Sequence, residues 1–379
     1  MFGPLERCAA IVKKETRELI RDPVYLGLGF VVPVVVMLLF GYGLNTDVKN
    51  LPLMFVDRDR TPVSRNYIDS FVHSEYFRLV GVTSEAGEAD EMLRTGKARV
   101  VIDIPPDFAR RLAGLEAASV GIQIDGSFPS RGEVIKGYVT AINALFNQTL
   151  VVDALARAGR AGATPPITLD LSVWYNPSLE SINVIVPGMM AIILMLFPAL
   201  LGALLIVRER ESGTIFNFFA SPVKRWEILA GKAIPYVTVA FLNYVVLFAM
   251  GRFLFGVPFT GSLTVLTAGA LLYSFCTIGI GLLVSVLTRS QIAAMLITFL
   301  VTLTPAFNYS GFLAPVSAQD EIGQFIARLI PATYFMDVVR GSYLKGLGFE
   351  AYRTNLIALF LYTVLLYGLA WAALKKRIG

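Results

Sequence analysis

The sequence predicts an α-helical polytopic membrane protein with six transmembrane helices and an inserted extracytoplasmic α/β domain. Of its 379 residues, 55% are hydrophobic and only 16% are charged, whereas soluble domains are about a quarter charged. Six stretches are apolar and long enough to cross a bilayer, which takes about 20 residues. A long polar segment lies between the first and second of them, and strand-like and helix-like patterns alternate within it.

Residues 1–23 are predicted to form a helix that lies on the cytoplasmic membrane surface. Pro23 ends the pattern. Such a helix is typical of a membrane interface, although a soluble N-terminal helix would give the same pattern. The apolar residues that recur at helical spacing are Leu5, Ala9, Val12, Leu19 and Ile20.

The first transmembrane helix is expected at 24–44, which holds no charge, and no cleavage pattern of a signal peptide follows it. It is therefore interpreted as an uncleaved anchor. Helices two to six are expected within 182–374, and GVPF in the fourth stretch reads as part of a turn. Their charge-free stretches are 182–207, 233–251, 253–288, 290–319 and 354–374.

Lysine and arginine predict that both termini are cytoplasmic. In this orientation the cytoplasmic segments 1–23, 208–232, 289 and the tail 375–379 hold 5, 5, 1 and 3 basic residues, 14 in all. The short outer segments hold five. The long segment is left out of the count because long loops translocate regardless of charge. The expected location is a bacterial inner membrane.

The α/β domain is expected over 45–180. Asp57, Asp59 and Asp125 are interpreted as solvated acids at strand ends, in preference to a carboxylate site. The predicted strands are LPLMFVD, ARVVIDIP and VGIQIDG, and the predicted helices are TPVSRNYIDSFVHSEYF, PPDFARRLAGL and a long one from Arg131 to Gly159.

No catalytic, cofactor-binding or metal-ligating arrangement is expected. The only histidine is His73, and the only cysteines, Cys8 and Cys276, fall in different predicted compartments. No glycine-rich phosphate loop ending in Gly-Lys-Ser/Thr occurs. The cores of the six helices also lack the Asp, Glu, Lys and His residues that ion-coupled transporters carry at membrane depth. If the helices move a solute uphill, another protein must supply the energy.

The segment VRERESGTIFNFFASPVKRWEILAGK, residues 207–232, joins two apolar stretches with far more than a minimal turn. Gly213 is expected to end helix two, and TIFNFFAS to form a short helix along the membrane. Ser221 and Pro222 are expected to be the N-cap and first residue of the next helix. This segment would face a cytoplasmic partner, although an ordinary basic loop with interfacial aromatic residues would look alike.

Two motifs of the chain resemble those of ABC-2 type transporter permeases. The first lies in 207–232, and the second is LIPATYFMDVVRGSYLKG, residues 329–346. The inserted domain, opening with PLMFVDRDRTPVSRNYID, is similar to that of the drug-export-like branch. The residues of the first motif that match are Arg210, Glu211, Gly213, Thr214, Ser221, Pro222, Glu227, Gly231 and Lys232.

The resemblance implies a dimeric membrane subunit, homodimeric or heterodimeric, that couples to two copies of a separate ABC ATPase. ATP and Mg²⁺ would bind to that partner. Coupling would run through the helix after Gly213 and the N-terminal helix, and 319–346 would form an outer re-entrant hairpin broken by Pro331. The coupling residues would be Arg208, Glu209, Arg210, Glu211, Ser212, Gly213, Thr214, Ser221, Pro222, Lys224 and Arg225.

The function expected is ATP-driven efflux of amphipathic or hydrophobic small molecules through a path at the dimer interface. Two alternatives stay open: export of lipid-linked or polymeric cargo by the same fold, and a membrane receptor or adaptor that transports nothing. Membrane lipids and a periplasmic adaptor are further partners to consider, and nucleic acid is not. Candidates for the path are Phe197, Phe241, Phe248, Phe299 and Phe307.

Overall fold

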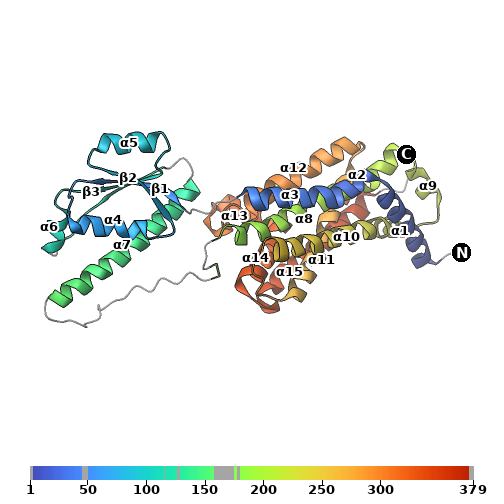
Figure 1. Ribbon diagram of the computed structural model, residues 1–379. Helices are drawn as coiled ribbons and strands as arrows, with labels where there is room; N and C mark the ends of the chain where they lie inside the picture. The colour runs from blue at the N-terminus through green and yellow to red at the C-terminus, as the bar shows by residue number, and fades with distance from the viewer. Residues whose placement is uncertain are drawn as a thin grey trace. The chain divides into compact units, whose positions relative to one another are not determined.

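The computed structural model describes residues 3–44, 50–114, 116–125, 129–157, 175–176 and 180–374. The chain divides into two compact units. A helical unit combines Met1–Asn45 with Ser178–Gly379, and an α/β unit comprises Thr46–Pro177. The chain therefore leaves the helical unit after the helix that ends at Gly43 and returns to it before the helix that begins at Ile182 (Figure 1). The tail expected at 375–379 lies outside the described residues.

Six helices in the described part of the chain are long and apolar enough to cross a membrane. They confirm the predicted fold class, because the α/β sheet lies between the first and the second of them. The six are Pro23–Gly43, Ile182–Glu211, Arg225–Leu254, Leu263–Leu287, Gln291–Tyr309 and Phe349–Ala373.

The helical unit begins with α1 and continues from the first span into the other five. Its α-helices are α1 (Pro4–Arg21), α2 (Pro23–Leu26), α3 (Val32–Gly43), α8 (Ile182–Glu211), α9 (Ile215–Ala220), α10 (Arg225–Ala249), α11 (Leu263–Leu287), α12 (Gln291–Tyr309), α13 (Glu321–Arg328), α14 (Pro331–Arg340) and α15 (Phe349–Ala373). Short turns of other helix types are Gly27–Val31, Met250–Leu254, Val316–Ala318 and Gly341–Lys345.

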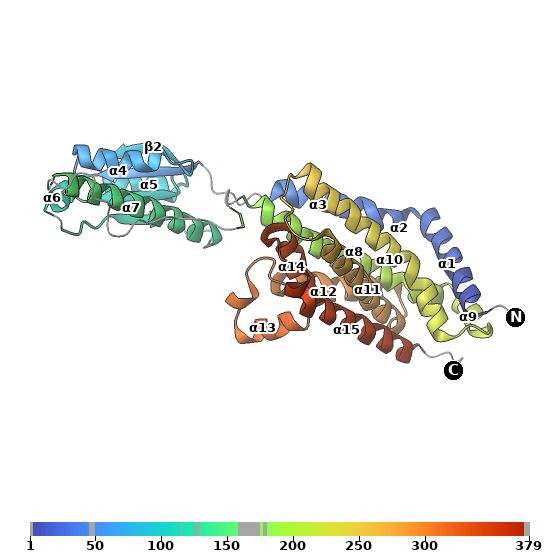
Figure 2. The same cartoon turned by 90° about the horizontal axis from the view of Figure 1, so that it is seen from below.

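Helix α8 is the centre of the bundle and is buried along its whole apolar length. It packs against α3, α10, α11, α12 and α14 (Figures 1 and 2). Its crossing with α11 depends on two glycines, as in many membrane bundles. A Cβ on Gly281 would lie 2.0 Å from the Ala199 carbonyl oxygen, and a Cβ on Gly202 would lie 2.6 Å from that of Ile278.

The segment expected as a re-entrant hairpin contains α13 and α14. Pro331 begins α14, and Gly346 ends the turn that follows in the left-handed region, at φ +63°. Arg340 anchors this segment, because its guanidinium donates to the backbone carbonyl oxygens of Gly311, at 2.5 Å, and Phe312, at 2.9 Å. Entry of the pair into the membrane stays a prediction.

The α/β unit is a four-stranded sheet of order β2-β1-β3-β4, in which β1 pairs in parallel with β2 and β3, and β4 is antiparallel to β3. Helices α4, α6 and α7 contribute to the apolar core on one face, and α5 packs on the other (Figure 1). The strands are β1 (Leu51–Asp57), β2 (Phe77–Thr83), β3 (Val100–Ile104) and β4 (Gly121–Ile124), and the helices are α4 (Pro62–Val72), α5 (Ala86–Arg94), α6 (Phe108–Ala113) and α7 (Pro129–Arg157).

The three aspartates interpreted above as solvated acids all take part in local interactions. Asp59 accepts hydrogen bonds from the Thr61 hydroxyl and the Ala109 backbone N–H, and Asp125 pairs with Arg99. The prediction of a solvated acid is wrong for Asp57. Its side chain is buried because its carboxylate accepts the Ser64 hydroxyl, at 2.8 Å, and two backbone N–H groups of the turn after β1.

Candidate functional site

The connection between α8 and α10 is shorter than the segment 208–232. Residues 208–211 are the last turn of α8, and 225–232 are the first two turns of α10. Gly213 has φ +75°, a conformation that glycine adopts without steric cost, and the chain turns there into the short helix α9. Figures 1 and 2 place α1 and α9 at the same end of the bundle.

The prediction for Ser221 and Pro222 is wrong, because α10 begins later, at Arg225. The Ser221 hydroxyl donates to the Phe218 carbonyl oxygen at 2.8 Å and so belongs to the end of α9. Glu227 fixes the start of α10, since its carboxylate accepts the backbone N–H of Lys224 at 2.9 Å.

Helix α1 buries a stripe that contains a carboxylate. Ile11, Glu15 and Leu19, spaced four residues apart, are its buried residues, whereas Leu5 and Ile20 are exposed. A carboxylate in an apolar stripe needs a cationic partner, because an unpaired buried charge is costly. The stripe faces α10 and the end of α8.

Lys232 of α10 supplies that partner. Its ammonium nitrogen lies 2.6 Å from a carboxylate oxygen of Glu15 and 2.9 Å from one of Glu209, near the end of α8. All three side chains are buried. One ammonium group therefore joins α1, α8 and α10.

Lys14, Thr214 and Phe218 contact this group as well. Together with Glu15, Glu209 and Lys232 they are called the ionic cluster. Lys14 pairs with Glu209, with Glu15 at 3.3 Å and with Glu18 at 3.1 Å. Burial lowers the pKa of Lys14, but the hydrogen bond to Glu209 and the nearby carboxylates outweigh it and raise the pKa above its usual range. The Thr214 hydroxyl donates to Glu209, and the Phe218 ring lies 5.3 Å from the Lys232 nitrogen. The cluster thus includes the helix α9.

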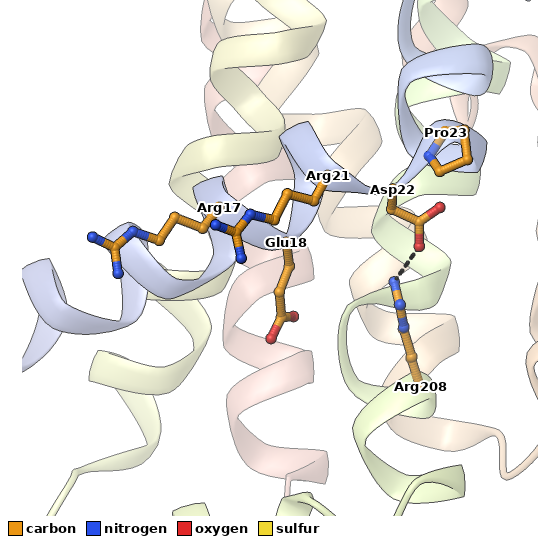
Figure 3. A pocket seen from close by; sticks show the side chains of 6 residues that line it. All are labelled: Arg17, Glu18, Arg21, Asp22, Pro23 and Arg208. Atoms are coloured by element: carbon orange, nitrogen blue, oxygen red, sulfur yellow. Dashed lines mark ion pairs between the residues drawn. The ribbon is translucent and has the colours of Figure 1, made fainter.

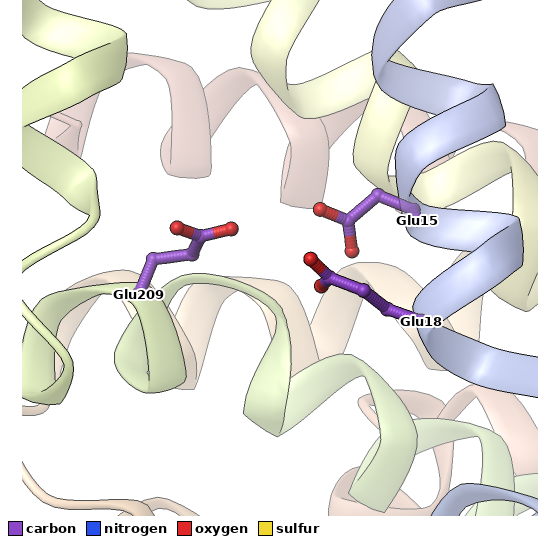
Figure 4. A group of neighbouring side chains, drawn as sticks. All are labelled: Glu15, Glu18 and Glu209. Carbon is purple, nitrogen blue, oxygen red and sulfur yellow. The ribbon is translucent and has the colours of Figure 1, made fainter. Parts of the chain in front are cut away.

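Glu15, Glu18 and Glu209 face one another (Figure 4), with one carboxylate oxygen of each within 4.8 Å of the others. This spacing would suit a metal ion if the carboxylates were free. Here Lys14 and Lys232 contact them directly and supply two positive charges. The three carboxylates are therefore assigned to an ion-pair network and not to a metal site.

Two further contacts fasten α1 to α10. Arg7 pairs with Glu227 at 2.9 Å. At Gly231 the helices approach so closely that a Cβ would lie 2.8 Å from the Ile11 side chain. The Gly231 and Lys232 pair of the sequence motif thus serves the packing of α1.

The last turn of α8 also holds the junction of α11 and α12. Glu211 accepts the Gln291 backbone N–H at 2.8 Å and a second hydrogen bond from the Gln291 side chain. Arg210 donates to the carbonyl oxygens of Val286 and Thr288 at the end of α11, at 3.1 and 2.5 Å. The last turn of α8, which precedes α9, is therefore bonded to four other helices, α1, α10, α11 and α12.

A family model described as ABC-2 family transporter protein matches residues 24–372. The chain belongs to this family.

Curated relatives match the chain almost from end to end. The probable multidrug ABC transporter permease YbhS of Escherichia coli K12 is 29% identical over 375 residues, which cover 98% of this chain and 97% of the relative. YbhR of the same organism, with the same description, is 27% identical over 98% of this chain and 99% of its own. The inner membrane transport permease YhhJ of that organism is 27% identical over 97% and 96%.

The predicted coupling residues of this ABC-2 permease fall into two groups by exposure. The first group is buried or half-buried and comprises Arg208, Glu209, Arg210, Gly213, Ser221 and Arg225. The exposed group is Glu211, Ser212, Thr214, Pro222 and Lys224, of which Glu211 and Thr214 are also bonded to Gln291 and Glu209. Two aromatic side chains beside them are exposed as well, Phe216 by 53% and Trp226 by 44%. Contact of either group with an ATPase stays a prediction.

The five predicted path residues differ in exposure in the single chain. Phe197 is buried, whereas Phe299 on α12 is 41% exposed. The other three are partly buried against the apolar core: Phe241, Phe248 and Phe307. Their role in a path stays a prediction.

Sequence reasoning did not find Arg7, Lys14 and Glu15 as members of the site. A signal was present: Glu15 lies four residues from both Ile11 and Leu19, so it interrupts an apolar helical stripe. Its partner could not be identified from the sequence, because Lys232 lies 217 residues away.

Proposed function

We propose that this ABC-2 permease is the membrane-spanning subunit of an exporter driven by a separate ABC ATPase. Its termini would be cytoplasmic, and it would pair with a second permease, identical or different. The cargo would be amphipathic or hydrophobic small molecules, in line with the multidrug names of YbhS and YbhR. This chain would hydrolyse no ATP and would hold no cofactor of its own.

The ionic cluster is the observation that supports coupling of an ATPase to the membrane spans. A partner that pushes on α9 would meet Thr214 and Phe218, which contact the cluster, and Lys232 joins that cluster to α1, α8 and α10. Separating buried charges of opposite sign is costly. Force on α9 would therefore move two spans and α1 as one body.

A surface for the partner lies beside the cluster. The hollow between α1 and α9 has a volume of about 480 Å³ and combines charged and apolar side chains, as protein interfaces do. It is lined by Glu6, Arg7, Ala10, Ile11, Lys14, Phe218 and Val223. The exposed Phe216 and Trp226 would supply the aromatic anchors that dominate binding in many interfaces.

Two variants test the coupling claim. Gly213→Pro forces φ from +75° to about −65°, and Glu211→Ala removes both bonds to Gln291. We expect permease dimers that still assemble but show reduced ATP-driven efflux, because Gly213→Pro changes the turn through which α8 connects to α9 and Glu211→Ala detaches the end of α8 from α12. Lys13→Ala, an exposed change on α1, is the control. Normal efflux in both variants would contradict the coupling claim.

A further inference from the structure

An open hollow of about 430 Å³ lies where α1 meets the start of the first span and the end of α8 (Figure 3). It differs from the hollow beside α9, because the two have no lining residue in common. Its lining is almost wholly charged: Arg17, Glu18, Arg21, Asp22, Pro23 and Arg208.

The charges of this hollow are unbalanced. Both carboxylates already have partners, since Glu18 pairs with Lys14 at 3.1 Å and Asp22 with Arg208 at 3.0 Å. Arg17 and Arg21 are exposed and have no ion pair or hydrogen bond with any residue that the structure describes. Their side chains extend side by side from α1 in Figure 3. Two guanidinium groups are thus free to turn toward an anion without breaking a bond.

Guanidinium groups favour phosphate, because their planar forks donate two parallel hydrogen bonds to its oxygens. Arg17 and Arg21, one helical turn apart, would present two such forks. The shared chemistry is therefore that of a phosphate ester anion, which a lipid headgroup or a soluble molecule could supply.

The surroundings favour the lipid. Ile20 is 61% exposed and Val24 is 59% exposed, and both lie beside the hollow in sequence. Pro23, in the lining, is also the first residue of the first span. Basic side chains next to exposed apolar ones at a span end are typical of the headgroup region of a bilayer. We propose that this hollow binds the phosphate of an anionic phospholipid, held by Arg17 and Arg21.

The lipid would brace α1, because Glu18, which lines the hollow, is bonded to Lys14 of the ionic cluster. The site does not depend on the proposed export function, since it needs only the helical unit and a bilayer.

Retention of phosphatidylglycerol by the purified full chain, measured by native mass spectrometry against phosphatidylcholine, tests the proposal. Arg17→Gln with Arg21→Gln is expected to weaken the preference for phosphatidylglycerol about twenty-fivefold, since each of the two basic residues near an anionic surface is worth about a factor of five. Lys13→Gln with Lys224→Gln removes the same charge from exposed positions outside the hollow, and it is expected to keep the preference.

Three results would overturn the proposal. An equal loss in the Lys13 and Lys224 pair would mean diffuse attraction in place of a site. Equal retention of the two lipids by the unaltered chain would exclude a preference for anionic headgroups. Displacement of the lipid by millimolar glycerol phosphate or inorganic phosphate would assign the hollow to a soluble anion. We expect neither soluble compound to compete, because neither reaches the apolar contacts at Ile20 and Val24.

Discussion

Replacing Lys232 by methionine is expected to weaken the attachment of α1 to the bundle. The variant leaves the buried carboxylates of Glu15 and Glu209 with Lys14 as their remaining cation. Carboxylate oxygens of these residues lie within 4.8 Å of each other. At that separation two unit charges repel by roughly 3.5 kcal/mol at an effective dielectric constant of 20. This value agrees with the cost of about 3–5 kcal/mol for breaking a buried pair.

We expect Lys232→Met to lower the free energy of unfolding by about 3 kcal/mol, the lower end of that range. The effect is not larger because Lys14 still offsets part of the charge of the two carboxylates. For a unit of this size the loss corresponds to a melting temperature lower by roughly 6–12 °C. Thermal unfolding of the purified protein measures it, and hydrogen exchange should show α1 amides losing protection first.

The control is Lys224→Met, which removes an exposed lysine near the start of α10. Adding Glu15→Gln to Lys232→Met removes one of the repelling charges and should recover much of the lost stability. Equal melting of Lys232→Met and Lys224→Met, with α1 protection unchanged, would refute the inference that the ionic cluster holds these helices together.

Two further predictions concern packing in each unit. Gly281→Ala would place a Cβ 2.0 Å from the Ala199 carbonyl oxygen, so α8 and α11 must separate, and we expect at least 1–3 kcal/mol of destabilisation, about the cost of overpacking, in thermal unfolding. Gly368→Ala on α15, where a Cβ meets nothing within 4 Å, should leave the melting temperature unchanged or higher; similar behaviour of the two variants would contradict the close approach. Tyr67→Phe removes the hydrogen bond of 2.6 Å from the Tyr67 hydroxyl to Asn143 and should cost about 1 kcal/mol, seen as faster hydrogen exchange in α4 and α7. Burial also raises the pKa of Tyr67. The ultraviolet titration of the unaltered chain minus that of Tyr67→Phe should therefore show one tyrosine that ionises above the ordinary tyrosine pKa of about 10. Ionisation at or below that value would contradict the burial of Tyr67.

The sequence predicted the membrane spans well because length and lack of charge define them. The start of α10 is the exception: Ser221 and Pro222 predict a helix that begins at Pro222, whereas α10 begins three residues later, at Arg225. Glu227 and Lys232 are tolerated in the helix because Arg7, Glu15 and Glu209 neutralise them. Pairing between distant segments is invisible in a single sequence, so the sequence does not predict the ionic cluster.

The α/β unit was predicted in part. Strands β1 and β3 are apolar runs in the middle of the sheet, where most of their residues are buried, and the sequence predicts both. The sequence predicts no strand at β2, whose first residue, Phe77, is the last residue of the predicted helix TPVSRNYIDSFVHSEYF. Exposure at a sheet edge is not the reason, because the edge strand β4 is exposed as well and its alternating run VGIQIDG predicts a strand. Helix α5 covers the second face with a small apolar contact and was likewise not predicted.

ATP-driven uptake of a hydrophobic dye into inside-out vesicles tests the central claim most directly. The vesicles would hold this permease and its co-purifying ABC ATPase, beside vesicles with an ATPase variant that cannot hydrolyse ATP. The account predicts uptake only with the active ATPase, and its loss in Gly213→Pro. ATP hydrolysis by a bound ATPase with no dye, lipid or polymer moved would contradict export, and the chain would then be a membrane receptor or adaptor.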